Sequence, residues 1–519
     1  MNRELLVDKI ENEKGFWDVV VIGGGATGLG TALEAASRGY KTLLLEQHDF
    51  SKCTSSRSTK LVHGGVRYLQ QGNISLVLEA LHERGLLMQN APHLVHNQSF
   101  IVPNYDWWDG PFYGIGLKVY DLLAGNLGLG PSKILSKEEV IQHIQNIEPE
   151  GLRGGVIYHD GQFDDSRLAI NLAQTIIEQN GVALNYFEVT SLLKKNGLIN
   201  GIIAIDKETE KEFSINARVV INATGIFTDN ILKLDNPEAK KITALSQGVH
   251  LILDKEFLPG NSAIMVPQTD DGRVLFAVPW HNKVVVGTTD TEVNDAVLEP
   301  KPLEEEIEFI LKHAKKYMQN DPTRKDVKSV FAGIRPLVKP AENKGTASIS
   351  RDHYLVISES GLVTITGGKW TTYRKMGEDT INQAALVAGL EEKASITKNL
   401  RIHGWLKNTD TSDPLYVYGS DAEAIKRFTN DDTNLSEVIS NLFPKIKAEI
   451  LWHIKNEMAR TVEDVLARRT RLLLLDAKES IMIAPIIAEI MAFELNKSES
   501  WKIDQIKSYT NLATNYIVN

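Results

Sequence analysis

The fold is decided by residues 18–46, DVVVIGGGATGLGTALEAASRGYKTLLLE. The apolar run 18–22 predicts a strand that leads directly into three glycines. The small residues of 29–38 predict a helix, which ends at Gly39, and the apolar run 41–45 predicts a second strand. Strand, helix and strand in this order indicate a β-α-β unit with parallel strands, so we expect an α/β protein.

The glycines have the Gly-x-Gly-x-x-Gly spacing of a dinucleotide site. Gly23 permits a tight turn, Gly25 lets a pyrophosphate approach the backbone, and Gly28 permits close packing of helix on strand. The first turn of the helix, which holds Thr27, then offers N–H groups to the phosphates. Glu46 ends the second strand, 18 residues after Gly28, where a carboxylate can accept hydrogen bonds from a ribose.

Two later glycine sites bear on the identity of the dinucleotide. The apolar run 219–221 precedes Ala223-Thr224-Gly225, and Thr366-Gly367-Gly368-Lys369 follows much later. Together with the first glycines they suggest one large cofactor that three distant segments contact. A glycine pair beside a flavin can turn N–H groups toward its pyrimidine edge. Taken alone, each later site is more often a simple turn.

Composition limits the class of protein. The chain has 519 residues and a net charge of −10, which suggests about three domains and argues weakly against nucleic acid as a partner. We see no apolar run long enough for a transmembrane helix, and the charged N-terminal residues do not resemble a secretory signal. The single cysteine, Cys53, excludes an internal disulfide. His93 and His96 lack a third ligand, so we predict no metal site.

Residues 54–69, TSSRSTKLVHGGVRYL, closely resemble a signature of the FAD-dependent, quinone-linked glycerol-3-phosphate dehydrogenases. Four further blocks follow in the order of that family: GIRPL (333–337), SRD (350–352), GGKWTTYR (367–374) and EDVLARRT (463–470). The resemblance implies an α/β chain with three parts. We expect a glutathione-reductase-like FAD-binding Rossmann domain (1–75, 155–235 and 340–395), a sheet-based substrate domain (76–154 and 236–339) and a C-terminal α-helical domain (400–519).

The resemblance also implies an activity. We expect oxidation of sn-glycerol 3-phosphate to dihydroxyacetone phosphate by hydride transfer from C2 to flavin N5, with the electrons passed to a membrane quinone. Besides the first glycines, Thr27 and Glu46, the residues expected to hold FAD are Thr54, Ser55, Ser58, Lys60, His63, Gly64, Gly65, Ala223, Thr224, Gly225, Gly368 and Lys369.

A phosphate dianion requires fixed cations, and the fork of an arginine suits its oxygens. The family pattern points to Arg67, Arg335, Arg351 and Lys369 for the substrate, with Tyr68 beside them. Thr289 is a further candidate for the pocket wall; a turn capped by Asp290 is the competing interpretation.

His250 matches an active-site position of the family. We expect it to act as the acid–base group while Arg335 polarises the C2 oxygen. A purely structural histidine is the alternative.

The stretch 104–130 bears on location, because it is rich in aromatic and apolar residues such as Tyr105, Trp107, Trp108, Phe112 and Tyr113. Such stretches dock on membranes, although a buried core element is the competing interpretation. For Arg468, Arg469 and Arg471 a paired helix face is favoured over lipid contact. We expect a cytoplasmic chain, with peripheral binding to the inner face of the cell membrane as one option and a homodimer as another.

Three other functions remain open. A glycerol-3-phosphate oxidase would use oxygen and release hydrogen peroxide, but the long central insertion common in such oxidases is not evident here. A deaminating amino-acid oxidase would share the fold and need an arginine for its carboxylate substrate. A non-catalytic module would use the C-terminal helices to bind a partner.

Overall fold

The predicted β-α-β unit is present in the computed structural model, which describes residues 1–65, 73–105, 109–270, 272–339 and 353–518. After helix α1 (Arg3–Asn12), strand β1 (Trp17–Ile22) leads through the glycines into α2 (Ala26–Ser37) and then β2 (Thr42–Leu45). Strands β1 and β2 pair in parallel. Their side chains are almost all buried, which explains the continuous apolar runs in the sequence.

The first sheet is built around this unit and contains eight of the described strands. Its order is β17 (His353–Ile357), β18 (Val363–Gly367), β10 (Lys211–Asn222), β1, β2 and β7 (Val182–Leu184). A hairpin of β8 (Phe187–Lys195) and β9 (Leu198–Asp206) extends from β10. Helices α2, α7 (Asp165–Glu178) and α10 (Tyr373–Ala388) pack together on this sheet.

Strands β18, β10 and β1 run parallel, so their carboxyl ends lie at one edge. The glycine segments at 23–28, 223–225 and 367–368 follow these three strands directly. The topology therefore brings together the three segments that the sequence analysis assigned to one cofactor.

The second sheet contains ten strands and is mainly antiparallel. Its order is β15 (Thr291–Val293), β11 (Thr243–Asp254), β14 (Lys283–Gly287), β13 (Leu275–Trp280), β12 (Ala263–Val266), β4 (Val95–Asn104), β6 (Gly154–Phe163) and β3 (Leu61–Val62). Strand β16 (Ser329–Val338) pairs with β11, and β5 (Lys133–Ser136) pairs with β6. Its helices are α4 (Ile74–Asn90), α5 (Asp109–Ala124), α6 (Lys137–His143) and α9 (Glu304–Tyr317), while the short α8 (Thr228–Asp235) follows β10.

The pairing of strands in the second sheet crosses two of the predicted domain boundaries. Strands β3 and β6 pair with each other in the second sheet, although 1–75 and 155–235 were assigned to the FAD-binding part. Strand β6 runs into α7 of the first sheet after a single residue, Asp164. No composition change marks such a crossing, so the pattern of the sequence could not locate it.

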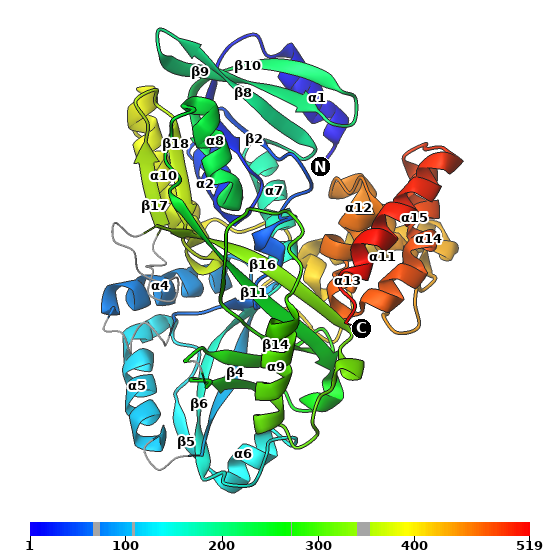
Figure 1. The fold of residues 1–519 in the computed structure, drawn as a ribbon. Helices are drawn as coiled ribbons and strands as arrows, with labels where there is room; N and C mark the ends of the chain where they lie inside the picture. Colours follow the sequence, from blue (N-terminus) through cyan, green and yellow to red (C-terminus); the bar gives the residue numbers. More distant parts are fainter. Residues whose placement is uncertain (66–72, 106–108, 271, 340–352, 519) are drawn as a thin grey trace.

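The C-terminal part is helical, as predicted, and lies to one side of the two sheets (Figure 1). It contains α11 (Ala422–Asp431), α12 (Lys447–Asn456), α13 (Leu472–Leu475), α14 (Ala477–Glu494) and α15 (Glu499–Thr514). Residues 461–475 do not form one continuous helix. A capping box of Thr461 and Asp464 opens a π-helix, Asp464–Arg469, which ends before Arg471 adopts a positive φ of 61°.

The arginines of this segment are buried and paired. Arg468 and Arg469 both donate to the carboxylate of Asp49, which lies in the turn after β2, with N–O distances of 2.5 Å. Arg471 pairs with Asp164 at 2.8 Å. Their burial excludes the lipid contact considered from sequence, and the pairs join the C-terminal helices to both sheets.

The aromatic stretch supplies part of the core of the second sheet. Leu117, Tyr120 and Ala124 of α5 are buried against α4 and the sheet, whereas Leu122 of the same helix is 80% exposed. Trp107 and Trp108 lie outside the described residues. Within the described ranges, no helix is both long and apolar enough to cross a bilayer.

The packing of α2 on β1 allows a test of Gly28. A Cβ at this position would lie 1.8 Å from the carbonyl oxygen of Gly23, which is backbone and cannot give way. Gly28→Ala should therefore lower the free energy of unfolding by about 3 kcal/mol, measured as a fall in the apparent melting temperature. The matched control is Gly116→Ala in α5, where no described atom lies within 4 Å of the added carbon and the stability should be kept or raised. Equal effects of the two substitutions would contradict the packing argument.

The Asp49 cluster allows a second test. Asp49→Asn leaves Arg468 and Arg469 without their shared carboxylate in a fully buried position. We expect a loss of about 3–5 kcal/mol in chemical denaturation, because unpaired buried charge is costly. Lys312→Ala, which breaks an exposed pair with Asp270, should cost less than about 1 kcal/mol. A small loss for Asp49→Asn would show that the cluster does not hold the C-terminal helices in place.

Candidate active site

A cavity of about 860 Å³ lies where the carboxyl ends of β1 and β10 meet strands β11 and β16 of the second sheet. Such a volume lies in the upper range of ligand and cofactor pockets. The predicted cofactor residues found in its wall are Gly23, Gly25, Thr27, Glu46, Thr54, Ser55, Ser58, His63, Ala223, Thr224, Gly225, Gly368 and Lys369.

The glycine turns after β1 and β10 form a dinucleotide cradle whose surface is backbone. Gly23 has φ of +111°, and a Cβ there would lie 2.6 Å from the carbonyl oxygen of Ala223. Gly225 has φ of +59° and faces open space, with no described atom within 4 Å of a Cβ position. Ser55 reaches the start of α2, where its hydroxyl accepts a hydrogen bond from the N–H of Ala26 at 2.9 Å. The remaining N–H groups of the turn fit the pyrophosphate of a dinucleotide.

Glu46 is held rigidly at the end of β2. Its two carboxylate oxygens accept hydrogen bonds from the N–H groups of Gly24 at 2.6 Å and His48 at 2.8 Å. Burial raises the pKa of Glu46. Each oxygen retains a second lone pair, so the position remains suited to the hydroxyls of a ribose.

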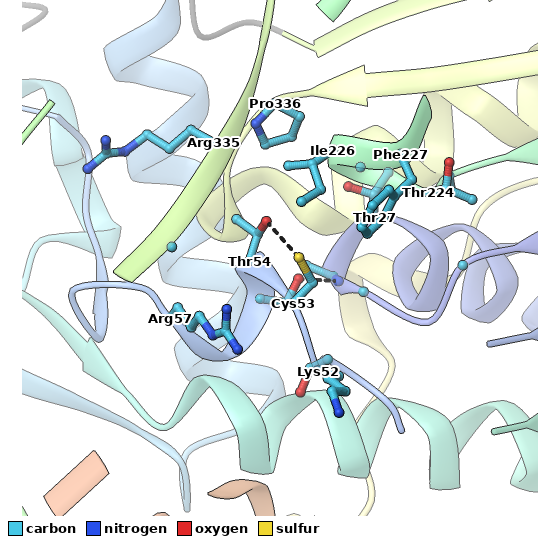
Figure 2. Close-up of a pocket in the computed structure, with 18 of the residues that line it drawn as sticks. Thr27, Lys52, Cys53, Thr54, Arg57, Thr224, Ile226, Phe227, Arg335 and Pro336 are labelled. Atoms are coloured by element: carbon cyan, nitrogen blue, oxygen red, sulfur yellow. Dashed lines mark hydrogen bonds between the residues drawn. The ribbon is translucent and has the colours of Figure 1, made fainter. Parts of the chain in front are cut away.

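The segment 54–60 connects the two sheets along the cavity. The hydroxyl of Thr54 donates to the carbonyl oxygen of Ile334 in β16 at 2.7 Å, and the indole N–H of Trp370 donates to the carbonyl of Ser55 at 2.8 Å. In the view of Figure 2, Thr54 is drawn below Pro336 and to the left of Thr27 and Thr224. The segment is therefore fixed at both sheets before any ligand binds.

Four predicted cofactor residues lie outside the cavity wall. Lys60 is fully buried, and its ammonium donates to both oxygens of Asp165 at 2.8 Å. The N–H of Gly64 donates to the hydroxyl of Tyr120 at 2.8 Å. Gly28 and Gly65 are likewise absent from the wall. Lys60 and Gly64 thus make contacts within the protein, and the assignment of these four residues to the cofactor stays a prediction.

Arg335 supplies a fixed cation. Its guanidinium donates to the hydroxyl of Thr288 at 3.0 Å and to the carbonyl oxygen of Thr289 at 3.2 Å. Gly248 makes room for it, because a Cβ there would lie 2.3 Å from Nη2 of Arg335. In Figure 2 the side chain extends away from Thr27, so this cation and the dinucleotide cradle lie at different ends of the cavity.

Thr289 does not line the cavity, contrary to expectation. It is fully buried, and its hydroxyl donates to Glu306 at 2.8 Å while accepting from the N–H of Val249 at 3.0 Å. It therefore supports the loop that holds Arg335. The hydroxyl of the preceding Thr288 is the one that contacts the guanidinium.

His250 lies on β11 at the edge of the same cavity and is 2% exposed. Its ring stacks on Phe331, with centroids 4.9 Å apart. Burial, with Arg335 and Lys60 nearby, lowers the pKa of His250 well below its usual value. The imidazole is therefore neutral at ordinary pH and able to accept a proton or a hydrogen bond.

Of the other cations predicted to bind substrate, the structure places only Lys369. Lys369 follows Gly367 and Gly368, which have φ of 78° and 72°, and it lies in the cavity wall. Arg67, Tyr68 and Arg351 lie outside the described residues. The described part of the chain holds no cluster of His, Cys, Asp and Glu suited to a metal ion.

Sequence reasoning missed three residues of the site. Thr59 lines the cavity and contacts His250, Phe331 stacks on that ring, and Asp165 holds Lys60. Thr59 lies inside the matched signature between Ser58 and Lys60, so its place in the motif was the available signal. The other two come from strands and helices far along the chain, where no motif marks them.

Comparisons with known proteins agree with this geometry. A family model described as FAD dependent oxidoreductase matches residues 18–374, and one described as the C-terminal domain of alpha-glycerophosphate oxidase matches 363–502. The mitochondrial glycerol-3-phosphate dehydrogenase of Homo sapiens is 40% identical over 98% of this chain and 74% of its own length. A probable mitochondrial glycerol-3-phosphate dehydrogenase of Dictyostelium discoideum is 38% identical over 98% of this chain and 84% of its own.

A solved structure gives the same result at the level of the fold. The glycerol-3-phosphate dehydrogenase from Bacillus halodurans, complexed with FAD, superposes with a TM-score of 0.81 at 27% identity, covering 99% of this chain and 97% of its own. The chain is thus an FAD-dependent oxidoreductase and belongs to the glycerol-3-phosphate dehydrogenase family.

Proposed function

We propose that the chain oxidises sn-glycerol 3-phosphate to dihydroxyacetone phosphate. The observation that carries this proposal is the pairing of a neutral imidazole, His250, with a fixed guanidinium, Arg335, in the cavity that also contains the dinucleotide cradle. The names of the relatives point to the same substrate.

His250 and Arg335 would have different roles in the oxidation of a secondary alcohol. FAD held by the cradle would supply the two-electron oxidant that accepts a hydride from C2. As the hydride departs, negative charge builds on the C2 oxygen, and the guanidinium of Arg335 lowers the energy of that charge. The neutral imidazole of His250 provides the destination for the hydroxyl proton.

The phosphate would bind to the other cations of the site. Lys369 lies in the cavity wall, and the family pattern adds Arg67 and Arg351, with Tyr68 beside them. A phosphate dianion in such a pocket gains both charge and hydrogen bonds from its partners. This arrangement would favour a phosphorylated alcohol over free glycerol.

We further propose a membrane quinone as the electron acceptor, reached by peripheral binding at the inner face of the cell membrane. Support comes from the apolar side chains that α5 leaves exposed, Val119 and Leu122. A homodimer remains a prediction. The alternative function is an oxidase that passes electrons to oxygen and makes hydrogen peroxide.

The substrate assignment is tested by anaerobic titration of the FAD-loaded protein with sn-glycerol 3-phosphate while the flavin absorbance is followed. We expect stoichiometric bleaching and formation of dihydroxyacetone phosphate. Glycine and proline should leave the spectrum unchanged; bleaching by either one, without reaction of the phosphate ester, would identify an amino-acid oxidase instead.

His250 can be tested in the same assay. His250→Asn should slow flavin reduction by about 100-fold or more, because a positioned base contributes that much. His82→Asn is the matched control, since His82 has a half-exposed side chain and lies outside the cavity wall. Near-normal reduction by the His250 variant would remove this residue from the reaction.

The pH dependence gives an independent measure of the same group. Because the pKa of His250 is lowered well below 6.5, the imidazole should stay neutral as the pH falls through 6.5. Protonation of the imidazole should therefore slow flavin reduction only at more acidic pH. A bend of the wild-type rate near pH 6.5 assigned to His250 would contradict the burial argument.

The acceptor is tested with reduced enzyme. We expect rapid reoxidation by a short-chain quinone and slow reoxidation by oxygen, with stronger quinone reduction when vesicles of anionic lipid are present. Stoichiometric hydrogen peroxide at a rate matching turnover would instead support the oxidase.

A further inference from the structure

His250 borders the cavity but is almost fully buried. Nε2 lies 2.9 Å from the hydroxyl oxygen of Thr59, and Nδ1 is buried with no hydrogen-bond partner in the described ranges. His250 itself is 2% exposed, whereas Thr59 is half-buried and lines the cavity. A substrate in the cavity would therefore meet the hydroxyl of Thr59 before it meets the imidazole.

Thr59 is held in place from both sides by one carboxylate. Asp165, at the start of α7, accepts from the N–H of Ser58 at 3.2 Å and from its hydroxyl at 2.7 Å. The same carboxylate accepts from the ammonium of Lys60 at 2.8 Å, and Lys60 has a positive φ of 65°. Asp165 and Lys60 are both fully buried. The position of the Thr59 hydroxyl is thus set by an ion pair that does not itself line the cavity.

The imidazole is equally confined. Phe331 stacks on one face at an interplanar angle of 16°, and Gly287 packs near the ring, where a Cβ would lie 2.5 Å from Cδ2 of His250. The Lys60 ammonium lies 5.4 Å from the centre of the Phe331 ring. Burial, with the nearby cations Arg335 and Lys60, lowers the pKa of His250 and keeps the imidazole neutral before reaction. The ring cannot readily turn Nδ1 toward the cavity, so Nε2 and its contact with Thr59 provide the route outward.

We propose that Thr59 is a catalytic residue that carries the proton between the substrate hydroxyl and Nε2 of His250. This inference rests on the proposed function. As the hydride leaves C2 with its electron pair for the flavin, the O–H bond of the substrate breaks and the C2–O bond becomes a carbonyl. The released proton bonds to the hydroxyl oxygen of Thr59, whose own proton bonds to Nε2. Thr59 is unchanged overall, and His250 gains one proton.

Two substitutions separate the hydroxyl from the shape of the side chain. Thr59→Val keeps the branched shape and removes the hydroxyl, while Thr59→Ser keeps the hydroxyl. Flavin reduction by sn-glycerol 3-phosphate is measured anaerobically by stopped flow between about pH 6 and pH 9, with FAD content and substrate Kd measured on the same samples. Thr429→Val, at a half-buried position of α11 outside the cavity wall, is the matched control.

We expect Thr59→Val to be slowed by about 100-fold, with a rate that rises about tenfold per pH unit because hydroxide must then remove the proton. Thr59→Ser should stay within about threefold of the wild type and follow its pH profile. Substrate Kd should change little in either variant. A Thr59→Val enzyme of near-normal rate, or a slow one with the wild-type pH profile, would overturn the proposal.

A second measurement does not depend on turnover. In protein labelled with ¹⁵N-histidine and free of substrate, the Nε2 resonance of His250, assigned by its loss in His250→Asn, should shift in Thr59→Val and return in Thr59→Ser. An unchanged resonance in Thr59→Val would overturn the hydrogen bond on which the proposal depends. If wild-type flavin is not reduced by sn-glycerol 3-phosphate at all, the proposed function fails, and this resonance still reports whether Thr59 holds His250.

Discussion

The site depends on the close approach of two backbone turns at the carboxyl edge of the first sheet. The turn at Gly23 lies so near Ala223 that no side chain fits between them. Because β1 and β10 are parallel neighbours, this contact brings segments 200 residues apart to the same phosphate-binding edge. The dinucleotide cradle, and with it the position of a bound flavin, follows from that contact.

A second constraint connects the cradle to the chemistry. The buried pair of Asp165 and Lys60 joins the first helix after β6 to the segment that begins at Thr54. That segment bonds to β16 through Thr54 and contacts His250 of β11 through Thr59. Buried ion pairs are weak evidence for stability, but they do specify geometry when every partner is satisfied. Here the specified geometry places the hydroxyl of Thr59 in the cavity wall and in contact with His250.

Much of the fold followed from local pattern. The β-α-β unit, its glycine fingerprint and the helical C-terminal part were predictable because strand, turn and helix signals lie within 30 residues of one another. The crossing of β6 between the sheets was not, since nothing local marks it. For the same reason the sequence did not reveal the buried partners of Lys60 and Thr289. These partners, Asp165 and Glu306, are identified only by the tertiary structure.

The net charge of the chain does not predict the charge of the cavity wall. The chain carries −10 overall, yet the cavity wall contains four cations, Arg57, Arg335, Lys52 and Lys369, against two carboxylates, Glu46 and Glu188. Of these carboxylates, Glu46 accepts hydrogen bonds from two backbone N–H groups. Burial is the main cause of the lowered pKa of His250, and the charges of Arg335 and Lys60 add to it. A bound phosphate dianion would offset only the part that these cations contribute. The imidazole is therefore neutral in the free enzyme mainly because it is buried, and substrate binding would raise its proton affinity only in part.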